Sequence, residues 1–139
     1  PRFWEEVRRV ARPGAAFAAW TYGHARVTST VDVLMSDFYH RVVGPYWPPE
    51  RRLVEEGYAS IVIPFPELPA PQKLEAVVTW DASALLAYVE SWSATQRHLN
   101  ENGREGLDAF EKCLRESWGN QPLRTVSWPL AVRAARLRP

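Results

Sequence analysis

Cysteine is nearly absent from this chain of 139 residues, and histidine is scarce. The single cysteine, Cys113, excludes an internal disulfide and a cysteine-based zinc site. The three histidines, His24, His40 and His98, lie far apart and form no H-E-x-x-H motif, and no serine stands in a G-x-S-x-G motif. The sequence therefore predicts no metal site and gives little support to a hydrolase or a metalloenzyme.

Glycine-rich phosphate loops are missing as well. The seven glycines never form a G-x-G-x-x-G motif or a P-loop, which are the arrangements in which backbone amides hold phosphates. The chain by itself therefore has no recognisable loop for a nucleotide, and we expect it to bind no cofactor when it is alone.

Long apolar runs and an excess of one charge are also lacking. No apolar run approaches the roughly 20 residues that span a bilayer, and the start lacks the pattern of a signal peptide. We therefore expect no membrane association and a cytoplasmic location. Seventeen basic residues face sixteen acidic ones, so no basic face for phosphates is expected, and nucleic acid is not a predicted partner.

The composition that remains, with 46% hydrophobic residues, is typical of one globular domain, here residues 1–139. It opens with an amphipathic helix over residues 2–11, which the Pro13-Gly14 turn ends. The apolar run at residues 15–20 then predicts a strand. Because this run does not alternate with polar residues, we expect both of its faces to be covered, as in a parallel α/β sheet.

The rest of the chain divides into an insertion and a regular part. Residues 25–71 are predicted to form a helical and proline-rich cap region, packed over the edge of the sheet. Within it, the pattern predicts a helix over 29–43 with Thr30 as its N-cap and a short helix that ends at Gly57. The regular part is predicted to contain a strand at 73–80, a helix at 82–100 capped by Asp81, a helix at 104–119 and a strand at 123–138 with Pro129 at a bulge or gap.

The opening stretch FWEEVRRVARPGAAFAAWTYG resembles the late segment of class I S-adenosylmethionine-dependent methyltransferases. In that family a helix ends in an LRPGG-like turn before the fifth strand, and residues 11–15 stand at this turn. Residues 37–68 and 85–98 are similar to the trans-aconitate-methyltransferase-like subgroup, which methylates small molecules, in some members carboxylates. Together these stretches span most of the chain.

This resemblance implies an α/β fold, the C-terminal half of a Rossmann-like class I methyltransferase. The family sheet has the strand order 3-2-1-4-5-7-6 with the seventh strand antiparallel, and residues 15–20, 73–80 and 123–138 are candidates for strands five, six and seven. S-adenosylmethionine is the implied cofactor of the complete enzyme. In the family a glycine-rich loop and an acidic residue hold it, and no position of this chain matches either. No catalytic residue can be assigned.

Candidate substrate-binding residues follow the strand at 15–20, because ligands of such folds bind at the carboxyl ends of strands. Trp20, Tyr22 and His24 lie there. Tyr22 or His24 could donate a hydrogen bond or act as a base. The alternative is an aromatic wall beside a surface histidine.

The cap and the helix at 82–100 supply five further candidates. Arg51 could hold a substrate carboxylate by two parallel hydrogen bonds, with Tyr46 and Trp47 beside it. The alternative for Arg51 is a solvated ion pair with Glu55. On the helix, the resemblance places Trp92 and Gln96 over the pocket, although a tryptophan at this position is more often part of a core.

Two classes of function remain open at this point. The chain is the substrate-side portion of a small-molecule methyltransferase, inactive when alone, or it is a free-standing dimeric binding module without activity. The strand at 15–20 has no neighbour on one edge, and such an edge attracts another strand. We therefore expect a homo-oligomer through this edge, unless a missing N-terminal half covers it.

Overall fold

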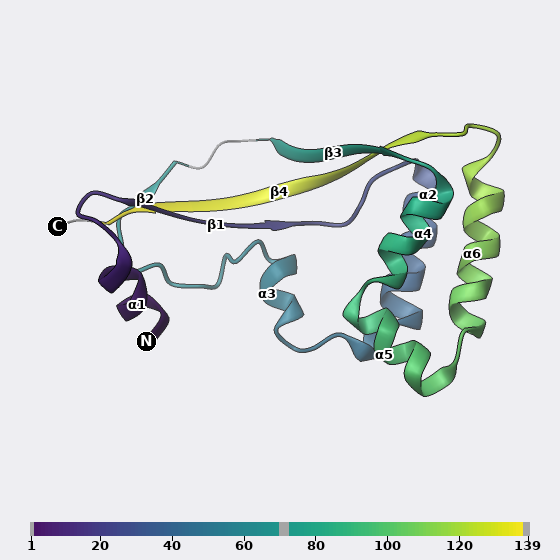
Figure 1. Ribbon diagram of the computed structural model, residues 1–139, viewed down its shortest axis with the longest axis horizontal. Coiled ribbons are helices and arrows are strands. Elements are labelled where there is room, and N and C mark those ends of the chain that lie inside the picture. Colours follow the sequence, from purple (N-terminus) through teal and green to yellow (C-terminus); the bar gives the residue numbers. More distant parts are fainter. Residues whose placement is uncertain (1, 70–72, 138–139) are drawn as a thin grey trace. The chain divides into compact units, whose positions relative to one another are not determined.

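The computed structural model describes residues 2–69 and 73–137, which form two groups of successive helices between the strands and one further helix at the start (Figure 1). The chain forms two compact units. Unit 1 comprises residues 1–23, 52–74 and 129–139, and unit 2 comprises residues 24–51 and 75–128. The elements are α1 (Arg2–Val10), β1 (Ala16–Tyr22), α2 (Ser29–Asp37), η1 (Phe38–Val42), η2 (Gly44–Tyr46), α3 (Arg51–Glu55), β2 (Glu67–Leu68), β3 (Leu74–Trp80), α4 (Ala82–Glu90), α5 (Ser93–Asn102), α6 (Glu105–Trp118) and β4 (Arg124–Arg136).

The division between the units falls inside the expected cap region at 25–71, between Arg51 and Arg52. The assignment of one domain with an inserted cap stays a prediction. None of the helices in the described part of the chain is both long and apolar enough to cross a membrane.

Unit 1 is built on a small antiparallel sheet. β1 pairs with β4 in a register that runs from Ala16 opposite Arg136 to Tyr22 opposite Leu130. β2 pairs with the other edge of β4, so β4 lies between β1 and β2 (Figure 1). Pro129 lies one position beyond the last β1–β4 pair, where its carbonyl accepts a hydrogen bond from Gly23 N at 2.9 Å. Its missing N–H therefore leaves the paired region intact.

The expectation that β1 is covered on both faces is wrong. Exposure alternates along the strand, with Thr21 buried and Trp20 64% exposed. In a strand, successive side chains point to opposite faces, so one face of β1 packs on the rest of unit 1 and the other does not. Alanine is apolar whether it is buried or exposed, so the residue types in this run do not show that burial alternates along the strand.

Unit 2 holds most of the buried side chains. Helices α2, α4, α5 and α6 surround a core that extends to the first residues of β4, and β3 also pairs with β4. The largest fully buried side chains of this unit are Leu85, Leu107, Leu114, Val31, Val43, Val89, Val126 and Thr95. The predicted helix at 104–119 is confirmed as α6, which ends at Gly119 with a φ of 69°, a left-handed value that suits glycine.

The predicted helix at 82–100 is two helices. Its N-cap is confirmed, because Asp81 Oδ1 accepts a hydrogen bond from Ala84 N at 2.7 Å. However, α4 ends at Glu90 and α5 begins at Ser93. Trp92 between them is extended, with a φ of −64° and a ψ of 137°. Trp92 contacts other aromatic rings of unit 2, and this packing overrides an uninterrupted helical pattern.

The predicted helix at 29–43 also differs at both of its ends. Its N-cap is Thr28 and not Thr30, because Thr28 Oγ1 accepts the hydrogen bond from Val31 N. From Phe38 the α-helix continues as the π-helical turn η1, in which Val43 N donates to Phe38 O at 3.0 Å. A π-helical turn carries one more residue per hydrogen-bonded turn, so it rotates the side chains that follow it.

Candidate functional site

Unit 2 gathers aromatic side chains around one tyrosine. Tyr39 on η1 is 2% exposed, and its ring centroid lies 5.0 Å from that of Trp47 and 5.7 Å from that of Trp92. Trp47 and Trp92 are 5.9 Å apart, and the ring of His24 meets Tyr39 edge-on at 4.5 Å. Together with Arg51 these residues form the Tyr39 cluster. These residues are up to 68 positions apart in the sequence, and all five belong to unit 2. Tyr39 lies on η1, Arg51 begins α3, and Trp92 lies just before α5.

Two consecutive residues of the π-helical turn η1 pack against different groups of aromatic side chains. Phe38 and Tyr39 are consecutive, and each is only 2% exposed. Phe38 packs against Phe110 of α6 at 4.6 Å between ring centroids, whereas Tyr39 packs against Trp47. Adjacent residues of a regular helix point in directions about 100° apart. One side chain of this consecutive pair therefore enters the core while the next forms the centre of the cluster, and π-helical turns often occur at functional sites.

Arg51 is held against the cluster by two kinds of contact. Its Nε donates a hydrogen bond to the hydroxyl of Tyr39 at 2.8 Å, and its guanidinium carbon lies 4.6 Å from the ring centroid of Trp47. Stacking on an aromatic face and one hydrogen bond fix the plane of the guanidinium. A guanidinium held in one plane is suited to bind a planar carboxylate through parallel hydrogen bonds.

The other candidates lie outside the Tyr39 cluster. The hydroxyl of Tyr46 accepts a hydrogen bond from Asn102 Nδ2, and the exposed Gln96 donates to the carbonyl of Glu90 at 2.7 Å. Trp20 and Tyr22 belong to unit 1, where both are exposed on the outer face of β1. Within unit 2 the structure thus brings His24, Trp47, Arg51 and Trp92 together, whereas Tyr46 and Gln96 form other contacts.

Tyr39 itself was missed as a site residue. The sequence places it in an apolar helical stripe, where a tyrosine is ordinary, and the change to a π-helical turn leaves no recognisable signal in the residue pattern. No group of three or more histidine, cysteine, aspartate or glutamate side chains among residues 2–69 and 73–137 is arranged to hold a metal ion. The site is therefore aromatic and cationic in character.

One shifted pKa lies on the surface of unit 2. The side chain of Arg104 donates to Glu90 Oε1 at 2.6 Å. This hydrogen bond, followed by the charge of Glu90, raises the pKa of Arg104. Both side chains are partly exposed, so the pair is a structural contact at the surface of unit 2.

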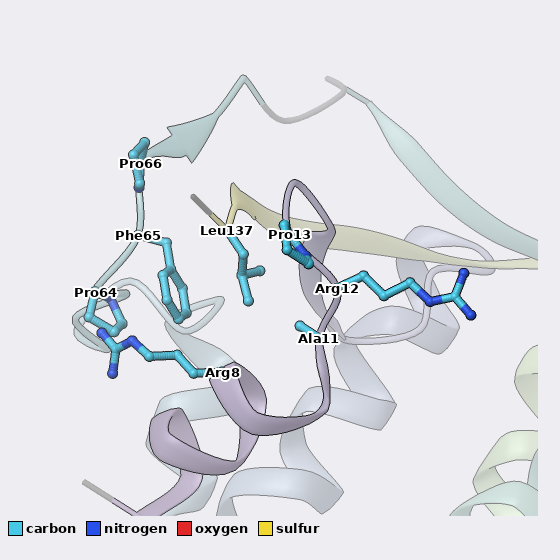
Figure 2. Close-up of a pocket in the computed structure, with 8 residues that line it drawn as sticks. All are labelled: Arg8, Ala11, Arg12, Pro13, Pro64, Phe65, Pro66 and Leu137. Carbon is cyan, nitrogen blue, oxygen red and sulfur yellow. The ribbon is translucent and has the colours of Figure 1, made fainter. Parts of the chain in front are cut away.

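Unit 1 contains a cavity of about 470 Å³ beside the Pro13-Gly14 turn (Figure 2). Arg8 stacks over Phe65, with its guanidinium carbon 4.9 Å from the ring centroid. Figure 2 shows the guanidinium groups of Arg8 and Arg12 pointing in opposite directions. They therefore do not converge on one anion. The residues that line this cavity are Arg8, Ala11, Arg12, Pro13, Pro64, Phe65, Pro66 and Leu137.

Comparison with known proteins identifies relatives of this chain. A solved structure of a "Putative Type II Methyltransferase" from Anaeromyxobacter dehalogenans superposes with a TM-score of 0.89 and 46% sequence identity, over 99% of this chain and 59% of that one. A "Putative methyltransferase" of Dictyostelium discoideum is 24% identical over 137 residues, which are 94% of this chain and 52% of that protein. No family model matches the chain.

The relatives imply S-adenosylmethionine as the methyl donor of the full-length enzymes, but the two cavities of unit 1 do not fit this cofactor. Its ribose hydroxyls are ordinarily bound by a carboxylate, and neither the cavity of Figure 2 nor the second cavity of unit 1, described below, is lined by one. Asp37 lines two smaller cavities of unit 2, of about 160 and 270 Å³. The chain spans only 52–59% of the length of these relatives. It is therefore related to part of proteins that are described as methyltransferases.

Proposed function

We propose that this chain is the substrate-side portion of an S-adenosylmethionine-dependent methyltransferase that acts on small molecules, and that it is inactive when alone. The observation that carries this proposal is the match of 99% of the chain, at 46% identity, to 59% of a methyltransferase structure. The pairing of β4 with both β1 and β3 supports it, because strands five, six and seven of the family would be arranged in the same way. Assigning β1, β3 and β4 to these strands is part of the proposal.

In this proposal the Tyr39 cluster binds the methyl acceptor. Arg51 holds a carboxylate of the acceptor, and Trp47 and Trp92 exclude water from it. Tyr39 acts as a positioning residue, because its hydroxyl holds Arg51 Nε. A carboxylate is already ionised at neutral pH, so the acceptor needs no strong base and alignment is the main contribution of these side chains.

The first test is calorimetric titration of a small tricarboxylate, citrate, into the purified chain. We expect Arg51→Gln to weaken binding by about 10–100-fold, because it removes charge-assisted hydrogen bonds. Arg52→Gln is the matched control, since Arg52 is an exposed neighbour that pairs with Glu56 at 3.2 Å. Arg52→Gln should leave the affinity unchanged, and an equal loss in both variants would contradict a specific role for Arg51.

A second titration, with S-adenosylmethionine, tests whether the chain is only a portion of the enzyme. We expect no binding heat at millimolar ligand, because no position of the chain matches the family's glycine-rich loop and neither cavity of unit 1 is lined by a carboxylate. One-site binding would instead show that this chain carries a complete cofactor site, and the substrate-side proposal would then be wrong.

The free edge of β1 favours a second candidate, a dimeric binding module. Among the described residues β1 pairs only with β4, and the outer face of this pair is apolar except at one end, where Arg136 lies opposite Ala16. Trp20 lies opposite Val132 on that face, and Tyr22 lies opposite Leu130. An open strand edge with apolar side chains is a site for strand addition. We infer that a second copy of the chain pairs with this edge, whether or not the chain belongs to an enzyme.

Sedimentation equilibrium measures this association directly. We expect a dimer at about 100 μM, and we expect Trp20→Lys to give a monomer because it places a charge on the edge strand. Val62→Lys is the control, because Val62 is 81% exposed in the loop between α3 and β2 and belongs to no strand. A wild-type chain that stays monomeric at this concentration would exclude the second copy as the partner of β1.

A further inference from the structure

The inner face of the unit 1 sheet borders a second cavity, of about 300 Å³. Ala19 of β1 and Arg133 of β4 are paired in the sheet register, so their side chains lie on the same face and both border this cavity. α1 contributes aromatic rings, and the segment after α3 contributes aliphatic ones. The lining residues are Phe3, Trp4, Phe17, Ala19, Tyr58, Ile61, Ile63 and Arg133.

Arg133 is the one charged residue of this lining, and its charge is matched. It forms a bidentate pair with Glu67, with Nη2 to Oε1 at 2.6 Å and Nε to Oε2 at 3.2 Å. Its Nη1 donates to the carbonyls of Tyr58 and Ile61. Because the guanidinium is paired and its side chain is only 18% exposed, the cavity offers no unbalanced charge to a ligand.

Arg133 also binds the carbonyl of Tyr58, in a turn whose backbone is strained and which forms one wall of the cavity. Gly57 and Tyr58 have φ values of 62° and 61°, so two successive residues are left-handed. Glycine adopts this conformation readily, but tyrosine does not. A Cβ on Gly57 would lie 2.8 Å from Ala131 Cβ, which shows how closely this turn approaches β4. Backbone strain of this kind persists where surrounding contacts over-determine it, and it is concentrated at ligand sites.

The aromatic side of the cavity is equally organised. The ring of Trp4 meets that of Phe17 edge-on at 5.1 Å, and Phe3 meets Phe17 at 6.2 Å. Phe3 remains 60% exposed, so the aromatic surface of α1 is open to solvent. An apolar, open cavity with a fixed wall and one neutralised arginine has the features of a preformed binding site for a small molecule.

We propose that this cavity binds a small, neutral aromatic molecule, at a site separate from the Tyr39 cluster. An apolar cavity of about 150 Å³ in another protein binds benzene, so twice that volume accommodates a fused two-ring molecule. The edge-on rings favour an aromatic ligand, because aromatic pairs prefer such geometry. The paired state of Arg133 disfavours a carboxylate, which would have to compete with Glu67.

Calorimetric titration of indole into the full chain tests this proposal. We expect submillimolar, one-site binding, within the range open to a ligand of this size. Ala19→Leu should weaken it at least tenfold, because the larger side chain fills the floor of the cavity. Ala18→Leu is the matched control: Ala18 is the next residue of β1 and points to the opposite face, so indole should bind that variant as it binds the wild type.

Two further measurements use the wild-type chain, so their outcome does not depend on whether a variant folds. Indole should shift the amide resonances of Phe17, Tyr58 and Ile61, and indole-3-carboxylate should bind at least tenfold more weakly than indole. Absence of binding at the solubility limit of indole, shifts confined to other residues, or equal affinity for the carboxylate would each overturn the proposal.

Discussion

Replacing Tyr39 by alanine is expected to lower the free energy of unfolding by about 3–5 kcal/mol, as other large aromatic deletions in protein interiors do. Tyr39 is buried and contacts Trp47 and Trp92, so its removal leaves a cavity that these rings border. Equilibrium unfolding in urea, followed by circular dichroism, measures the change.

A second substitution at Tyr39 separates the contribution of the hydroxyl from that of the ring, and a substitution at Arg41 serves as a control. Tyr39→Phe keeps the ring and removes the hydroxyl that accepts from Arg51 Nε, so it should cost about 1–2 kcal/mol. Arg41→Ala is a control on the same π-helical turn, because Arg41 is exposed and pairs only at the surface with Asp37. Its effect should stay within about 0.5 kcal/mol. A Tyr39→Ala variant no less stable than Arg41→Ala would exclude Tyr39 as the centre of the cluster.

Gly57→Ala is expected to destabilise the chain by about 2–4 kcal/mol, through a left-handed alanine and a steric clash together. Gly57 has a φ of 62°, and an added Cβ would lie 2.8 Å from Ala131 Cβ. Gly14 is the matched control, because its φ of 76° is similar and nothing lies within 4 Å of its Cβ position. Gly14→Ala should therefore lower the free energy of unfolding only by the cost of a left-handed alanine, about 1–2 kcal/mol.

A double substitution separates the two causes at Gly57. Combining Gly57→Ala with Ala131→Gly removes the close contact but leaves the left-handed alanine. We expect the double variant to lose less free energy of unfolding than the two single variants lose in sum. The difference should equal the steric part of the loss in Gly57→Ala. Strict additivity of the two changes in urea unfolding would show that the turn does not press on β4.

The two sites share no residue and offer different chemistry. The Tyr39 cluster presents the guanidinium of Arg51, held by Tyr39 and Trp47. The cavity of unit 1 is apolar, and its one arginine, Arg133, is paired with Glu67. Citrate and indole titrations therefore report on independent proposals, and either can fail without the other.

Local chemistry allowed several elements to be predicted from the residues alone. Asp81 was recognised as an N-cap, and α6 was placed correctly because its apolar residues recur at helical spacing and Gly119 ends it. The Pro13-Gly14 turn ends α1 before β1 for the same kind of local reason. Of the site, Arg51 with Trp47 could be proposed because they are near neighbours in the chain.

The remaining features depend on contacts between distant residues. An alanine-rich strand reads as apolar on both sides, and only the register with β4 decides which face is exposed. The break at Trp92 and the π-helical turn at Phe38 let aromatic side chains pack, and helical periodicity carries no trace of either. The sequence by itself determined the ends that caps and turns set, such as the N-cap at Asp81 and the stop at Gly119, because these signals act locally. Tertiary packing alone decided which faces are buried and that Tyr39 joins Arg51, because these depend on residues far apart in the chain.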